Sequence, residues 1–303
     1  MNLTWQLAVC VRLVANAVGT YWGRKMAERN TLAYSLVILY LTASIFSTTV
    51  AVVVGQFDLS ATTVVIFCIG ICNGAAMYFL LMANSKSTSQ NGFFTAFDDI
   101  AAMILMAIFV PVAVAKINWI SVIGILLCIG AAFALAYNNY RKKRTKDTGA
   151  IPMVFYLYAT LYTILWALAI FTLGFFALKD IGVWRFAAGW YCGSALTALV
   201  ILAIDLMGGL PHPKEPKHAS KGTIVLEGIG LGFSTALALV CQYAAFTVLS
   251  LVILQPLFLV SDVLVAIVIG VAFFGEGKKL DWRDTFWILI GIAGFFLVFL
   301  LPT

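Results

Sequence analysis

Four ionisable side chains lie deep inside long apolar runs of this 303-residue sequence: Arg12, Asp98, Asp99 and Asp262. An ionisable group in the middle of a membrane span costs about 2.5–3.5 kcal/mol on insertion scales, so each one requires a reason for its position. Low dielectric favours the protonated form of a carboxylate, so these aspartates are candidates to take up a proton or to bind a cation during transport. The alternative is a static role, in which Arg12 neutralises one aspartate and neutral hydrogen bonds hold another.

The balance of these charges indicates what kind of solute would fit. Three deep acids face one deep base, which leaves an excess of negative potential if all four groups line one cavity. A cationic or zwitterionic solute fits such a cavity better than a phosphate or a sugar nucleotide.

Further polar and aromatic residues are candidates for the same cavity. Tyr158, Tyr162 and Trp166 are spaced four residues apart, so they share one helix face and offer cation–π contact to an ammonium group. Asn73 and Gln242 carry amides that either orient a solute or bond between helices. For the three aromatic residues, ordinary packing within the bundle is the alternative.

Two prolines lie within apolar runs, at Pro111 and Pro256. A proline removes one backbone hydrogen bond, so each site is either a gating hinge that exposes carbonyl groups or a passive kink. The sequence contains no serine-hydrolase, metal-hydrolase or phosphate-loop signature. We therefore expect no catalytic residues, no metal ligands and no cofactor, and we do not expect an enzyme.

The elements that must position these residues are membrane-spanning helices. Hydrophobic residues make up 63% of the chain and charged residues 11%, whereas soluble domains are about one quarter charged. A spanning helix requires about 20 apolar residues, and only helices and closed barrels satisfy the backbone within hydrocarbon. Ten runs meet this requirement: 5–22, 34–54, 62–82, 90–114, 119–138, 152–178, 186–207, 223–244, 249–274 and 284–301.

An internal repeat divides the ten runs into two sets of five. A shift of 163 residues aligns 117–137 with 280–300 without a gap and places Asp99 on Asp262. An odd number of spans per repeat makes the second copy enter from the opposite face. We therefore predict an all-α polytopic membrane protein with ten transmembrane helices in two inverted five-helix repeats. The predicted units are residues 1–140, a basic linker at 141–150, and residues 151–303.

The distribution of basic residues predicts the orientation. Loops after odd-numbered runs hold fifteen Lys and Arg residues, whereas loops after even-numbered runs hold only Lys116, Lys179 and Arg185. The positive-inside rule places the odd loops in the cytoplasm and both termini outside. The net charge of +6 is then an orientation signal in an integral cell-membrane protein, and we expect no nucleic-acid partner.

Residues 243–300 carry features that resemble a known family. They include Pro256 early in the ninth run, the Phe274-Gly275-Glu276 turn and the pair Gly291 and Gly294. The stretch resembles the C-terminal half of an EamA-type repeat of the drug/metabolite transporter superfamily, while the first half departs at 111–117. The resemblance implies a ten-helix transporter with a central cavity between its halves. It also implies cytoplasmic termini, opposite to the orientation that the charges predict.

These observations predict a secondary transporter for a small organic solute such as an amino acid, an amine or a cationic metabolite. The expected partners are that solute and the lipid bilayer, with coupling to H⁺ or Na⁺ and a homodimer left open. The alternatives are a sugar-nucleotide or sugar-phosphate exchanger and a membrane scaffold that transports nothing.

Overall fold

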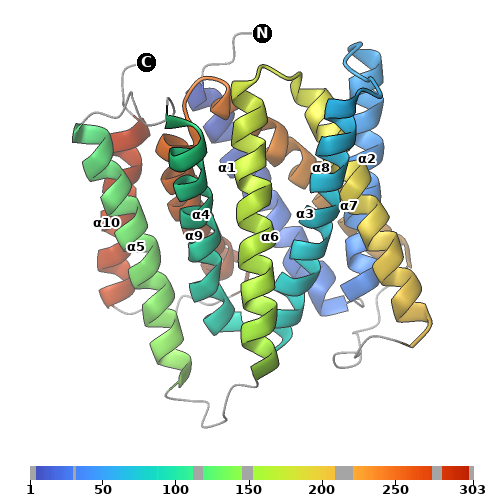
Figure 1. Ribbon diagram of the computed structural model, residues 1–303. Helices are drawn as coiled ribbons and strands as arrows, with labels where there is room; N and C mark the ends of the chain where they lie inside the picture. The colour runs from blue at the N-terminus through green and yellow to red at the C-terminus, as the bar shows by residue number, and fades with distance from the viewer. Residues whose placement is uncertain are drawn as a thin grey trace.

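A computed structural model describes residues 5–29, 32–86, 88–111, 119–144, 153–208, 221–274 and 282–299. Within these ranges the chain is all-α and forms ten helices, each lying where the sequence predicts an apolar run (Figure 1). The helices are α1 Trp5–Arg29, α2 Leu32–Val53, α3 Ala61–Lys86, α4 Thr88–Phe109, α5 Trp119–Arg144, α6 Met153–Leu178, α7 Val183–Leu206, α8 Lys221–Phe246, α9 Leu251–Phe274 and α10 Trp282–Phe299.

Several helix ends differ from the ends of the apolar runs. The helices α1 and α5 continue past their apolar runs into basic segments that end at Arg29 and Arg144. Helix α2 ends at Val53, and Gly55 follows with a φ of 68°, a left-handed conformation that suits glycine at a helix C-terminus. Helix α4 ends at Phe109, so Pro111 follows the helix and does not kink it, contrary to the expectation that it lies within the span.

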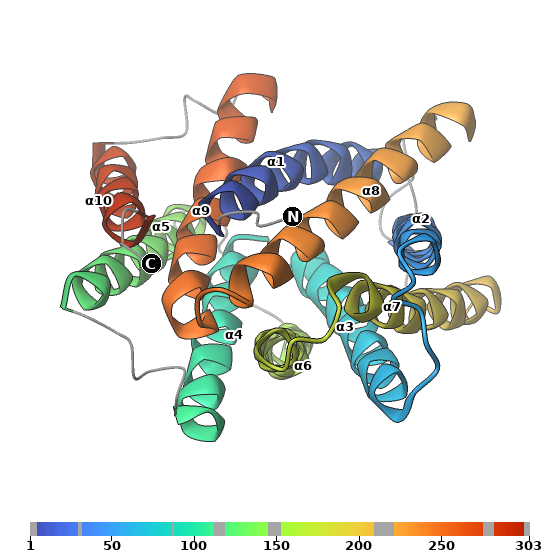
Figure 2. The same ribbon diagram turned by 90° about the horizontal axis from the view of Figure 1, so that it is seen from above.

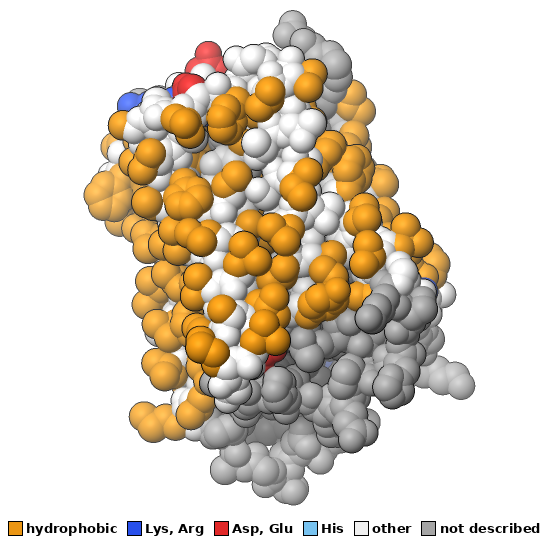
Figure 3. All heavy atoms as spheres, turned by 90° about the vertical axis from the view of Figure 1, so that its right-hand side faces the viewer, with side chains coloured by type: hydrophobic (Ala, Val, Ile, Leu, Met, Phe, Trp, Pro, Cys, Tyr) orange, Lys and Arg blue, Asp and Glu red, His pale blue; other side chains and the backbone are white. Residues whose placement is uncertain are grey.

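Six of the described helices are long and apolar enough to cross a membrane. The six segments are Ala33–Val53, Ala61–Leu80, Met153–Leu178, Val183–Leu206, Gly222–Phe246 and Leu251–Ile269. On the described part of the face seen in Figure 3, hydrophobic side chains are spread over most of the surface, and charged side chains gather near the upper end. A surface of this kind is stable in lipid and not in water, so the protein is a multi-pass helical membrane protein.

The helices of the two halves pack mainly across one another. Helix α1 lies along α8, α3 packs on both α6 and α7, α2 packs on α7, and α5 packs on α10 (Figures 1 and 2). Helix α9 contacts α1, α4, α5 and α10, and its residues 253–260 are all buried. Polar side chains on α9 therefore have to find partners within the bundle.

A close helix crossing joins α3 to α7. A Cβ atom on Gly70 would collide with the carbonyl group of Trp190, and a Cβ atom on Gly193 would collide with that of Phe67. Glycine at both positions lets the two backbones touch, which is how small residues strengthen helix pairs in lipid.

Candidate functional site

A chain of polar side chains crosses the bundle and begins at an ion pair between α1 and α9. Arg12 Nη1 and Nη2 donate to Asp262 Oδ1 and Oδ2 at 2.7 and 2.9 Å, in a bidentate arrangement. Asn16, one helical turn after Arg12, donates its side-chain amide to Asp262 Oδ1 at 2.7 Å. The guanidinium also lies 4.1 Å from the centre of the Phe258 ring, which adds a cation–π contact. The Arg12 guanidinium is therefore held by two residues of α9, and Asn16 of α1 binds the same carboxylate.

Two glutamines continue the chain from Arg12 to α4. Arg12 Nε donates to Gln242 Oε1 at 3.1 Å, and Gln242 Nε2 donates to Gln255 Oε1 at 3.3 Å. Gln255 Nε2 then donates to Asp99 Oδ1 at 2.7 Å. The structure thus connects the two aspartates that the repeat aligns, through Arg12 of α1, Gln242 of α8 and Gln255 of α9.

Asp98 extends the site from Asp99 to α6. Its Oδ1 accepts from the Asp99 backbone N–H at 3.0 Å, and its Oδ2 accepts from the Tyr162 hydroxyl at 2.7 Å. The Trp166 ring lies 5.7 Å from the Tyr162 ring on the same helix. Asp98, Asp99, Tyr162 and Arg12 are all buried, so this part of the network is withdrawn from the surface.

Asp262 differs from the pair Asp98 and Asp99 in having a cationic partner and in the exposure of its side chain. Asp262 has a cationic partner, yet 43% of its side chain remains exposed, so its carboxylate can be reached from outside the core. Within the described part of the chain, Asp98 and Asp99 accept only from neutral donors and are 1% and 8% exposed. The deep acids that Arg12 does not neutralise are therefore Asp98 and Asp99, because Arg12 pairs with Asp262.

Two of the residues expected in this site lie elsewhere. Tyr158 stacks on Phe79 of α3, with ring centres 6.1 Å apart, and takes part in a separate packing cluster. Asn73 donates to Ser194 Oγ at 2.8 Å and to the Tyr40 hydroxyl at 3.4 Å, in the contact region of α2, α3 and α7. Tyr158 corresponds to the packing alternative and Asn73 to the alternative of bonding between helices, while Tyr162, Trp166 and Gln242 lie in or beside the network.

The sequence interpretation missed Gln255 and Asn16. Gln255 lies seven residues before Asp262, and Asn16 lies four residues after Arg12. Both spacings place the amide on the same helix face as the charged residue, and this signal could have identified them. Pro256, which does lie inside α9, directly follows Gln255, so the helix lacks one backbone donor beside the network.

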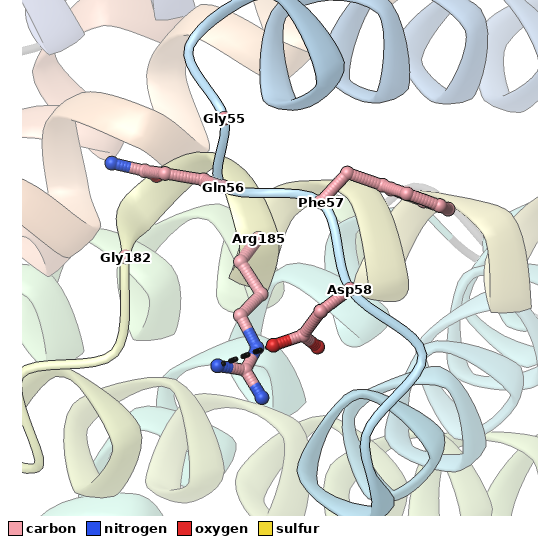
Figure 4. A pocket seen from close by; sticks show the side chains of 6 residues that line it. All are labelled: Gly55, Gln56, Phe57, Asp58, Gly182 and Arg185. Atoms are coloured by element: carbon pink, nitrogen blue, oxygen red, sulfur yellow. Dashed lines mark ion pairs between the residues drawn. The ribbon is translucent and has the colours of Figure 1, made fainter.

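A second polar cluster lies at one end of the bundle, where the α2–α3 and α6–α7 connections meet the first turns of α3 and α7 (Figure 4). Arg185 forms an ion pair with Asp58 at 2.9 Å and donates to Thr63 and Ser60. The Thr63 hydroxyl is the main cause that lowers the pKa of the Asp58 carboxyl. Gln56 Oε1 accepts from the backbone N–H of Trp184 at 3.1 Å, at the start of α7.

These contacts surround a cavity of about 170 Å³ lined by Gly55, Gln56, Phe57, Asp58, Gly182 and Arg185. The cluster ties two loops together at one end of the bundle. Since Arg185 already has three side-chain partners, we interpret its role as structural, linking the start of α7 to the α2–α3 connection.

Fold, apolar surface and internal network together define a multi-pass helical membrane protein. No family model matches the sequence, and no curated protein matches it. Among solved structures, 27 chains match this fold. One, described as "Crystal structure of protein", superposes with a TM-score of 0.71 over 96% of this chain and 95% of its own, at 15% identity. Similarity at this identity concerns the fold alone.

Proposed function

We propose that this protein is a secondary transporter for a small organic solute that carries a positive charge, such as an amine, an amino acid or a cationic metabolite. The proposal places it in the plasma or inner membrane, within the drug/metabolite transporter superfamily. The observation that carries the proposal is a polar chain that joins five helices inside an apolar bundle and ends at two acids without a cationic partner among the described residues. Ionisable groups so deep in a membrane protein mark solute and ion paths.

The packing of the helices supports two inverted repeats. Under the predicted symmetry, α2 corresponds to α7 and α5 to α10, and the members of each pair contact one another. The contact of α1 with α8 has its symmetric counterpart in the contact of α6 with α3. Inverted repeats of this kind bind solutes near the bilayer midplane, at the interface between the repeats.

Asp262 is the group at which we propose that a solute arrives, because its carboxylate is both anionic and accessible. Arg12 already occupies one side of that carboxylate, so an ammonium group would compete with an internal guanidinium. Competition of this kind favours a solute that brings its own hydrogen-bond donors and makes Arg12 the neutralising group of the empty state.

Transport by purified protein in proteoliposomes tests the proposal. The probes are a primary amine, a neutral amino acid, lysine and a sugar phosphate, each offered in uptake and in counterflow. Uptake or exchange of an amine or amino acid, reduced by Asp262→Asn, is the expected result. Exchange of the sugar phosphate alone would favour a different substrate class, and no movement of any probe in either mode would argue against transport.

A further inference from the structure

The hydrogen-bond chain between Arg12 and Asp99 can run in one direction only. A guanidinium has five N–H donors and no acceptor, so Gln242 must meet Arg12 Nε with its carbonyl oxygen. The Gln242 amide nitrogen is then left to donate to Gln255 Oε1, and the Gln255 nitrogen is left to donate to Asp99. Arg12 thus fixes the orientation of both amides, and the chain ends on an acceptor.

A change of charge at Asp99 acts on this chain from its other end. A hydrogen bond to a carboxylate is roughly twice as strong as one between neutral groups, so protonation of Asp99 weakens the last link. If the new O–H donates to Gln255, then Gln255 has to turn its oxygen toward Asp99 and its nitrogen toward Gln242. Gln242 would then turn as well and place its nitrogen against Arg12 Nε, where a donor meets a donor. Arg12 therefore loses its amide acceptor when Asp99 becomes a donor.

We propose that Gln242 and Gln255 are positioning residues that couple the protonation of Asp99 to the interaction between Arg12 and Asp262. The accessible acid and the buried acid then act as one unit, although their carboxylates have no direct hydrogen bond. This inference rests on the proposed function for its role in transport, whereas the coupling itself is a property of the folded protein. Pro256 beside Gln255 leaves α9 with a weaker backbone ladder at the point where the amide has to turn.

Other titratable groups have to be considered as the source of any pH effect. Those that face Asp99 within the described part of the chain are Asp98 on α4, Tyr162 on α6, Arg12 on α1 and Asp262 on α9. Helices α3 and α5 also pack on α4. On α3, Tyr78 interacts with Tyr158 and Asp205, and on α5, Cys128 packs against Ala131 and Val260.

Infrared titration of purified protein tests the coupling without a solute. The carboxylic acid C=O band of Asp99 is identified by its loss in Asp99→Asn and followed against pH. This band is measured in wild type, in Arg12→Gln/Asp262→Asn, in Gln255→Met and in the variant that carries all three substitutions. The paired substitution removes one positive and one negative charge, so it leaves the net charge and most of the through-space field unchanged.

If the proposed coupling operates, the paired substitution raises the proton affinity of Asp99 by about three- to tenfold. The reason is that the hydrogen-bond chain to Asp99 no longer begins at a cation. In the Gln255→Met background the same substitution produces no shift. Gln242→Met breaks the same chain at a less buried position and should also abolish the shift, which provides a second variant if Gln255→Met does not fold. Gln56→Met makes the same chemical change at a loop glutamine outside the chain and should leave the full shift in place.

Two results would overturn the proposed coupling. A shift of equal size with and without Gln255 would assign the effect to the field of Arg12 and Asp262. No shift in either background would show that Asp99 is independent of the ion pair. Since the titration needs no transported probe, a protein that shows the coupling but moves no solute would reject the proposed function and keep this inference.

Discussion

The two aspartates that the repeat aligns should respond in opposite ways to the same substitution. In Asp262→Asn, the Arg12 guanidinium loses its counter-ion while 8% of its side chain is exposed. A buried charge left unpaired costs about 3–5 kcal/mol, and the retained amide oxygen together with the 43% exposure of Asp262 reduces this to about 2–3 kcal/mol. We therefore expect a clear loss of stability for Asp262→Asn.

Asp99→Asn should cost less than about 1 kcal/mol, because asparagine keeps an acceptor for Gln255 and removes the repulsion from Asp98. Unfolding by SDS in mixed micelles measures both variants against wild type at neutral pH. Arg12→Met/Asp262→Leu, which removes both charges, serves as the matched control and should recover most of the stability lost in Asp262→Asn. Equal costs for the two single variants, or no recovery in the double variant, would refute the reasoning.

Other predictions concern the fold and its orientation. Gly70→Val should prevent accumulation of folded protein, because its side chain meets the Trp190 carbonyl; size-exclusion profiles in detergent measure this, and a normal profile would argue against the tight crossing. The pKa of Asp58 is lowered from 3.8 in the folded protein, so the carboxylate stabilises the fold above about pH 4 and loses this effect as pH falls through the lowered value. Asp58→Asn should therefore flatten the acid side of a stability–pH curve, and an unchanged curve would contradict this. A cysteine in place of Thr303 should react with an impermeant reagent on intact cells if the loop charges set the orientation; labelling only after permeabilisation would reverse it.

Local patterns in the sequence were sufficient to place the helices and to show that they lie in a lipid bilayer. Each described helix lies where an apolar run predicts it, because a helix satisfies its own backbone and needs only enough consecutive apolar residues. Pro111 shows where this reasoning stops, since composition places it within a run while α4 ends before it. The inverted repeat and the transport function stay predictions.

What the tertiary structure decided was the choice of partners. Arg12 and Asp262 are 250 residues apart, and Gln255 and Asp99 are 156 apart, so only the packing of α1, α4, α8 and α9 brings them together. The repeat aligns Asp99 with Asp262, yet one accepts from a neutral amide and the other pairs with a guanidinium. A sequence pattern follows the period of one helix, whereas a buried polar group takes the nearest donor that neighbouring helices provide. The sequence therefore determined which residues needed a partner, and the packing of the bundle determined which partner each one has.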